Sequence, residues 1–137
     1  MNDSKLNVGD QFTTKFQYSQ DQVNAFMDTS GDRNPIHYDE EYAAQTVFKR
    51  PIIHGFLSGA IFSKIFGTQF PGEGTIYLSQ ELKFMRPMYV DEPYNAIVEV
   101  IKIDRDKHRC IMATQVFNQN GKVTIGGQAV LINKKHL

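Results

Sequence analysis

Two side chains that can exchange protons lie five positions apart, Asp32 and His37. A carboxylate accepts protons and an imidazole accepts or donates one near neutral pH, so the two groups could transfer protons around one water molecule. On a regular helix they would point about 140° apart. Asn34-Pro35 excludes a regular helix there and predicts a bend that can turn both side chains toward one point. Taken alone, Asp32 is also typical of a turn residue, and His37 of a surface or core histidine.

A glycine at the start of an apolar segment supplies a different kind of group. Gly55 follows His54 and begins a predicted helix, whose first backbone N–H groups lack a partner within the helix. Such an N–H can stabilise negative charge developing on a carbonyl oxygen, and glycine permits close approach. Gly55 could equally serve only a tight turn into the helix. His54 is interpreted as a structural or cap residue rather than as a second catalytic group.

Other reactive residue types give weaker indications. Ser63 lies about two turns after Gly55 and, taken alone, predicts a buried serine bonded to a helix carbonyl. Lys83 and Arg86 could reach an anionic ligand tail or could simply lie on a solvated strand face. The sequence holds no nucleophile elbow, phosphate-binding glycine loop or zinc-ligand spacing, and its single Cys110 lies among apolar residues. We therefore expect no metal site.

Hydrophobic periodicity predicts the elements that must position these groups. In chain order they are a strand at 11–18, a helix at 19–29, a short helix from Asp39, an apolar helix at 54–66, and strands at 76–84, 94–103, 109–117 and 122–133. Ser19 and Gln22 form a capping-box pattern, and Gly31 is placed to end that helix. In the strand at 76–84 an apolar row should face inward, and Gly126-Gly127 predicts a bulge or a close approach.

These elements predict an α+β hotdog fold, in which a curved antiparallel sheet wraps around the central apolar helix. The last three strands should form an antiparallel meander. We expect one domain over residues 1–137. An open sheet leaves edge strands, and pairing two sheets edge to edge protects them, so a homodimer is predicted.

Charge limits the classes of partner. Lys plus Arg and Asp plus Glu number 15 each among 137 residues, which argues against a nucleic-acid or membrane-surface binder because both need a net basic face. Between residues 51 and 80 the formally charged residues are only Lys64 and Glu73, which places the core there. The N-terminal segment has no apolar stretch typical of a signal peptide, so a soluble, cytoplasmic protein is expected.

Three motifs together resemble the MaoC-like dehydratase family. They are Gly31-Asp32-Arg33-Asn34-Pro35-Ile36-His37, Arg50-Pro51-Ile52-Ile53-His54-Gly55 and Leu82-Lys83-Phe84-Met85-Arg86-Pro87. The first two motifs are specific when both occur at this separation. Within the family, the chain is most similar to the short (R)-specific enoyl-CoA hydratases, which have a single hotdog domain. The resemblance extends from about Leu6 to Ile132.

The resemblance implies reversible hydration of trans-2-enoyl-CoA to (R)-3-hydroxyacyl-CoA, with no metal or redox cofactor. Asp32 and His37 would hold the attacking water and manage the protons at C3 and C2. The N–H of Gly55 would polarise the thioester carbonyl, Ser63 would support the site, and Asn34 would brace the loop. Family members are typically dimers with the pocket near the subunit interface.

Two other functions remain open at this stage. One is a hotdog dehydratase or thioesterase that acts on acyl-carrier-protein or other acyl thioesters. The other is a non-catalytic acyl-CoA-binding module. The intact Asp32 and His37 pair counts against the module, as does the absence of any added basic segment from this sequence.

Overall fold

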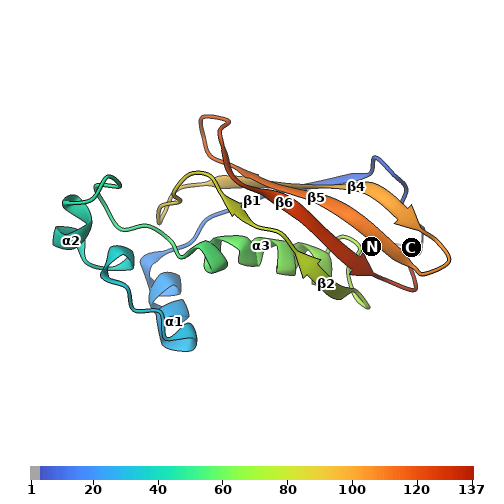
Figure 1. Cartoon of the computed structure of the whole chain (residues 1–137), viewed down its shortest axis with the longest axis horizontal. Coiled ribbons are helices and arrows are strands. Elements are labelled where there is room, and N and C mark those ends of the chain that lie inside the picture. Colours follow the sequence, from blue (N-terminus) through green and yellow to red (C-terminus); the bar gives the residue numbers. More distant parts are fainter. Residues whose placement is uncertain (1–3) are drawn as a thin grey trace.

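One curved antiparallel sheet dominates the structure, a computed structural model that describes residues 4–137. The sheet has six strands in the order β1-β4-β5-β6-β2, and β3 also pairs with β6 (Figure 1). The strands are β1 Gln11–Phe16, β2 Ile76–Gln80, β3 Lys83–Phe84, β4 Tyr94–Asp104, β5 Arg109–Phe117 and β6 Val123–Ile132. Strands β4, β5 and β6 are antiparallel neighbours, which confirms the predicted meander.

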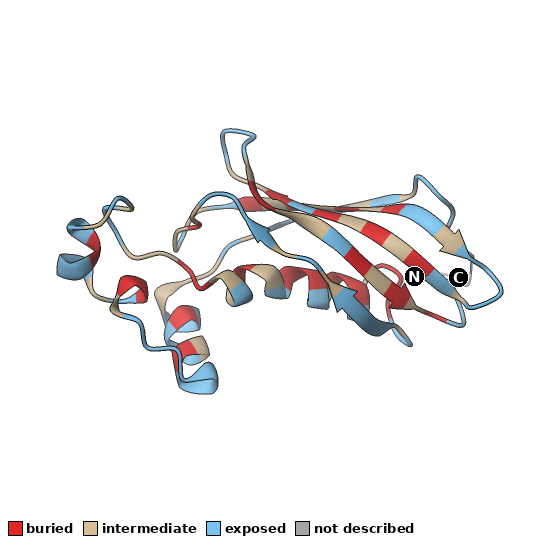
Figure 2. Cartoon of the chain, in the orientation of Figure 1, coloured by how far each residue is buried: buried red, intermediate tan, exposed pale blue. Residues whose placement is uncertain are grey.

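The long helix α3, Gly55–Thr68, lies along one face of the sheet. Its buried side chains belong to one core with buried residues of β4, β5 and β6, and Figure 2 shows the buried side of α3 facing the sheet. A helix packed this way against a curved antiparallel sheet is the predicted hotdog arrangement. Within residues 4–137, no helix combines the length and the apolar character that crossing a bilayer requires.

Two short helices lie beyond one end of α3 (Figure 1). Helix α1, Gln20–Ser30, begins with the predicted capping box of Ser19 and Gln22 and ends at Gly31, which has a φ of 80°. Helix α2, Glu40–Ala44, begins after Asp39, whose side chain accepts a hydrogen bond from the Tyr42 N–H. Between these helices the chain bends through a 3₁₀ turn, η1, Pro35–His37. The sequence therefore predicted this region correctly, because its caps and its proline act locally.

The prediction of one strand over 76–84 is wrong. The chain forms β2 and β3 with a break between them, and Ile76, Leu78 and Phe84 of the predicted inward row are exposed. Both parts pair with β6 in one register, Gln80 with Ala129 and Lys83 with Gly126. Between them the Glu81 N–H donates to the Gln128 carbonyl oxygen at 2.8 Å, and a Cβ added at Gly127 would lie 1.9 Å from the Glu81 carbonyl oxygen. The predicted close approach at Gly127 is therefore confirmed.

Candidate active site

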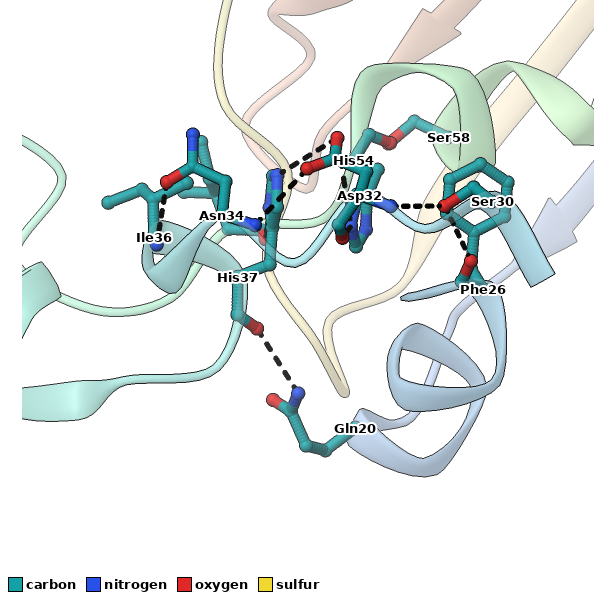
Figure 3. Close-up of polar contacts among 10 residues, drawn as sticks. Gln20, Phe26, Ser30, Asp32, Asn34, Ile36, His37, His54 and Ser58 are labelled. Atoms are coloured by element: carbon teal, nitrogen blue, oxygen red, sulfur yellow. Dashed lines mark hydrogen bonds and ion pairs between the residues drawn. The ribbon is translucent and has the colours of Figure 1, made fainter. Parts of the chain in front are cut away.

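Asp32 lies in the loop after α1, and bonds within that loop orient it (Figure 3). Its backbone N–H donates to Oγ of Ser30 at 3.1 Å. Its carboxylate oxygen Oδ1 accepts the backbone N–H of Asn34 at 3.2 Å. Asp32 thus is a turn residue, as one reading of the sequence suggested, but its second oxygen Oδ2 points toward two imidazoles.

His37 comes from the 3₁₀ turn and is buried, with 8% of its surface exposed. Its Nδ1 lies 2.7 Å from the carbonyl oxygen of Ile52. A carbonyl oxygen only accepts, so Nδ1 carries the proton and Nε2 presents a lone pair in the neutral ring. That Nε2 lies 3.9 Å from Oδ2 of Asp32. The bend at Asn34-Pro35 therefore brings the two predicted proton-transfer groups together.

His54 is the second imidazole. Its ring stacks on His37 with the ring centroids 3.6 Å apart and the planes 24° from parallel. Its Nε2 lies 3.0 Å from the main-chain carbonyl oxygen of Asp32. His54 is the N-cap residue of α3, as predicted, although its side chain makes no cap hydrogen bond among the described residues. Its contacts with two residues 17 and 22 positions earlier were not predicted, because nothing local in the sequence indicates them.

The neighbours of His37 move its pKa in opposite directions. Burial is the largest effect and lowers the pKa of His37 from 6.5. The bond to Ile52 raises it, the adjacent His54 lowers it, and Asp32 raises it, with a lowered pKa as the net result. His37 is therefore neutral at pH 7 and can accept a proton at Nε2.

Gly55, the first residue of α3, lies on the wall of a cavity of about 660 Å³. Asp32 and His54 line the same cavity, and most of the remaining wall is apolar, with Phe26, Phe48, Ile52, Phe56, Met85 and Met88 among its residues. The Phe84 ring packs directly on Gly55, since an added Cβ would lie 2.8 Å from its Cε1. The cavity combines Asp32, a helix-start residue and an apolar wall, whereas His37 contacts Asp32 from outside the described lining.

Ser63 does not match the expectation of a buried serine. It is exposed on α3, and the described serines that line the cavity are Ser30 and Ser58. The bond expected of Ser63 is made by the buried Ser58, whose Oγ donates to the carbonyl oxygen of His54 at 3.0 Å. Both serines lie in the helical segment, but only Ser58 is on the turn next to His54, a difference that helix periodicity did not resolve.

The remaining predicted site residues do not contact the Asp32 and His37 side chains in the same way. Asn34 Oδ1 accepts the N–H of Ile36 at 3.3 Å, which closes the 3₁₀ turn that carries His37. Arg86 lines the cavity and donates from Nη1 to the carbonyl oxygen of Val123 at 2.7 Å. Lys83 is exposed and is not among the described residues of the cavity wall.

Asp32, His37 and His54 could also be considered as metal ligands, since one ligand atom from each lies within 4.8 Å of the others. Their geometry is poorly suited to a metal. Nε2 of His54 donates to the Asp32 carbonyl, and stacked rings direct their lone pairs alongside each other rather than toward one point. The arrangement favours proton transfer over metal binding.

The model of the family described as MaoC like domain matches residues 4–120. The chain belongs to the MaoC-like family. The (R)-specific enoyl-CoA hydratase of Aeromonas caviae is 39% identical to it over 131 residues, covering 96% of this chain and 98% of that protein. A solved structure of the A. caviae (R)-hydratase superposes with a TM-score of 0.90 and covers 93% of this chain and 97% of the other.

A second relative is named for acyl carrier protein rather than for coenzyme A. The mitochondrial 3-hydroxyacyl-[acyl-carrier-protein] dehydratase of Arabidopsis thaliana is 33% identical and covers 93% of this chain and 77% of that protein. The family resemblance and the hotdog fold expected from the motifs are therefore confirmed.

Proposed function

We propose that this MaoC-like chain hydrates trans-2-enoyl-CoA thioesters to (R)-3-hydroxyacyl-CoA, and catalyses the reverse dehydration. The observation that carries the proposal is the convergence of Asp32 Oδ2 and His37 Nε2, 3.9 Å apart, beside the cavity that Gly55 lines. The near full-length similarity to an (R)-specific enoyl-CoA hydratase supports the same activity.

The geometry supports a simple division of roles. A water held between Oδ2 of Asp32 and Nε2 of His37 would lose a proton to the neutral imidazole as its oxygen bonds to C3 of the substrate. The electrons of the C2–C3 double bond move toward the thioester, where the carbonyl oxygen gains negative charge. The pair of Asp32 and His37 then gives the proton taken from water to C2 of the enolate. Water adds across the double bond, and the enzyme returns to its starting form.

Gly55 has a separate part in this proposal. Its N–H lies at the start of α3, where the helix dipole is positive and no partner within the helix is available. A donor directed at a developing oxyanion is typically worth about 10²- to 10³-fold in rate. Asn34 would hold the 3₁₀ turn that carries His37. A supporting role for Ser63 stays a prediction, because this serine is exposed and is not among the described residues of the cavity wall.

We also propose that two copies of the chain form a homodimer through β2. This strand is at the edge of the sheet, and its Ile76, Tyr77 and Leu78 expose apolar surface. Edge strands with apolar surface are protected by pairing with another chain. One domain over the full chain, no metal or redox cofactor and a cytoplasmic location remain predictions.

The activity is tested by following loss of the enoyl-thioester absorbance of crotonyl-CoA, with chiral analysis of the product. We expect turnover to the (R)-3-hydroxy thioester without added metal or cofactor. The matched comparison uses the same crotonyl group on acyl carrier protein. Turnover only on the carrier protein, or binding of crotonyl-CoA without turnover, would instead support the dehydratase or the binding module, respectively.

A further inference from the structure

The His54 side chain is buried between rings and backbone of the candidate active site. Only 2% of its surface is exposed. One face stacks on His37 at 3.6 Å, and the Phe26 ring from α1 lies with its centroid 4.8 Å away. Figure 3 shows the His54 side chain between the Asp32 loop and the end of α3 that carries Ser58. A buried polar ring in such a position needs a specific polar partner.

That partner is the Asp32 loop. Nε2 of His54 donates to the Asp32 main-chain carbonyl at 3.0 Å, whereas Nδ1 is buried and has no partner among the described residues. The proton of the neutral ring is therefore on Nε2. The other bonds that orient Asp32 come from Ser30 and Asn34 in its own loop. Of these bonds, only the one from His54 ties the loop to the helix that begins at Gly55.

We propose that His54 is a positioning residue, which aims the Asp32 carboxylate through its main chain and keeps the stacked His37 neutral. This inference rests on the proposed hydration. The groups facing His37 that carry or can gain charge are Asp32, from the loop, and His54, from the segment before α3. Two protonated imidazoles 3.6 Å apart would repel each other, so the pair does not readily hold two added protons.

The effects of neighbouring groups on the pKa of His37 support the proposal that His54 keeps His37 neutral. The charge of a protonated His54 lowers the pKa of His37 and acts together with burial. Asp32 acts in the opposite sense and raises it. Removing the imidazole of His54 takes away one of the two lowering effects and leaves both raising effects, from Ile52 and Asp32, so the pKa of His37 rises.

Two substitutions separate the functions of the ring. His54→Gln keeps an N–H that can reach the Asp32 carbonyl but removes the aromatic ring, and His54→Phe keeps a ring between Phe26 and His37 but removes the donor. We expect kcat for crotonyl-CoA to fall about 10- to 100-fold in His54→Phe with KM nearly unchanged, and to be partly restored in His54→Gln. In both variants the acid limb of the pH profile should move to higher pH.

A nuclear magnetic resonance titration of the His37 ring provides the second readout, and it does not need catalysis. The pKa of His37 should be higher in each variant than in the wild-type protein. An unchanged kcat and acid limb in folded His54→Phe would overturn the proposal. Equal loss of kcat in both variants with an unchanged His37 titration would also overturn it, since that result indicates a purely structural role.

The design also separates this inference from the proposed function. A wild-type protein that does not turn over crotonyl-CoA contradicts the proposed hydration, while the His37 titration still tests the coupling to His54. If His54→Phe does not fold, His54→Gln supplies the titration, and an unchanged His37 pKa there counts against the proposal.

Discussion

Oδ2 of Asp32 and Nε2 of His37 lie 3.9 Å apart, which is longer than a direct hydrogen bond between them. A single water can bridge two polar atoms at such a separation. The carboxylate and the neutral imidazole both act as acceptors here, so a bridging water can direct one proton to each. The distance therefore suits two groups that hold and deprotonate a nucleophilic water better than two groups that bond to each other.

The first prediction concerns the charge of Asp32. Asp32→Asn keeps an oxygen that can accept the Asn34 N–H but removes the negative charge beside His37. We expect kcat for crotonyl-CoA to fall about 10²- to 10⁴-fold. The Asp32 side chain is 52% exposed, so the melting temperature should change little. Asp28→Asn is the matched control, because Asp28 is a nearby acid paired with Arg33 on the surface. Equal activity of the two variants would contradict the assignment.

The second prediction is a pH dependence that arises from His37. Its pKa is lowered, mainly by burial, and the neutral ring is the form that accepts a proton. The hydration kcat/KM should therefore be constant above about pH 6.5 and fall as the pH drops through the lowered pKa. An acid limb centred above pH 6.5 in the wild-type protein would contradict this. Circular dichroism over the same range checks that the protein stays folded.

The same shift affects stability. Because the pKa of His37 is lower in the folded than in the unfolded protein, the unfolded chain takes up this proton first as the pH falls. The contribution of His37 to the free energy of unfolding is thus complete above about pH 6.5 and is lost as the pH falls toward the lowered pKa. The melting temperature should decline less over that window in His37→Gln than in the wild-type protein.

The third prediction concerns Gly55. Its Cβ position lies 2.8 Å from Phe84 Cε1, so Gly55→Ala must displace this ring at the cavity wall. We expect kcat to fall about 10- to 100-fold, whereas the free energy of unfolding should stay within about 1 kcal/mol because the exposed ring can move. Gly67→Ala in the same helix has nothing within 4 Å of the added Cβ and should keep full activity. Unchanged kcat in Gly55→Ala would contradict the need for a close approach at Gly55.

The fourth prediction concerns the close approach of two backbones at β6. Gly127→Ala would place a Cβ 1.9 Å from the Glu81 carbonyl oxygen, and backbone atoms cannot move aside as a side chain can. We expect a loss of about 1 to 3 kcal/mol in the free energy of unfolding, measured by urea denaturation. The neighbouring Gly126→Ala is the control, because its nearest contacts lie at 3.8 and 3.9 Å. Similar stability of both variants would contradict the close approach at Gly127.

The fifth prediction tests the homodimer. Leu78→Lys places a charge on the exposed apolar edge of β2, which should oppose pairing with a second copy. Sedimentation velocity should show a dimer for the wild-type protein and a shift toward monomer for this variant. Val47→Lys changes an apolar side chain that is 85% exposed outside the strands and helices and should leave the dimer intact. A wild-type monomer at micromolar concentration would contradict the proposal.

The features that could be predicted without the structure depend on residues that are neighbours along the chain. Ser19 and Gln22 lie one turn apart, so their capping box follows from spacing alone. The bend at Asn34-Pro35 is likewise local, because proline restricts its own backbone and that of the residue before it. The near absence of charge between residues 51 and 80 placed the core there, and apolar residues nearly all round the helix predicted its burial.

Features that depend on segments far apart in the chain could not be predicted, because folding alone brings those segments together. The predicted long strand divides at Glu81, whose backbone lies against Gly127, a contact that alternation of apolar residues does not record. His54 contacts Asp32 and His37, and the fold rather than sequence spacing brings these residues together. Helix periodicity identified an apolar α3 but did not distinguish buried Ser58 from exposed Ser63, because burial depends on which side packs against the rest of the molecule.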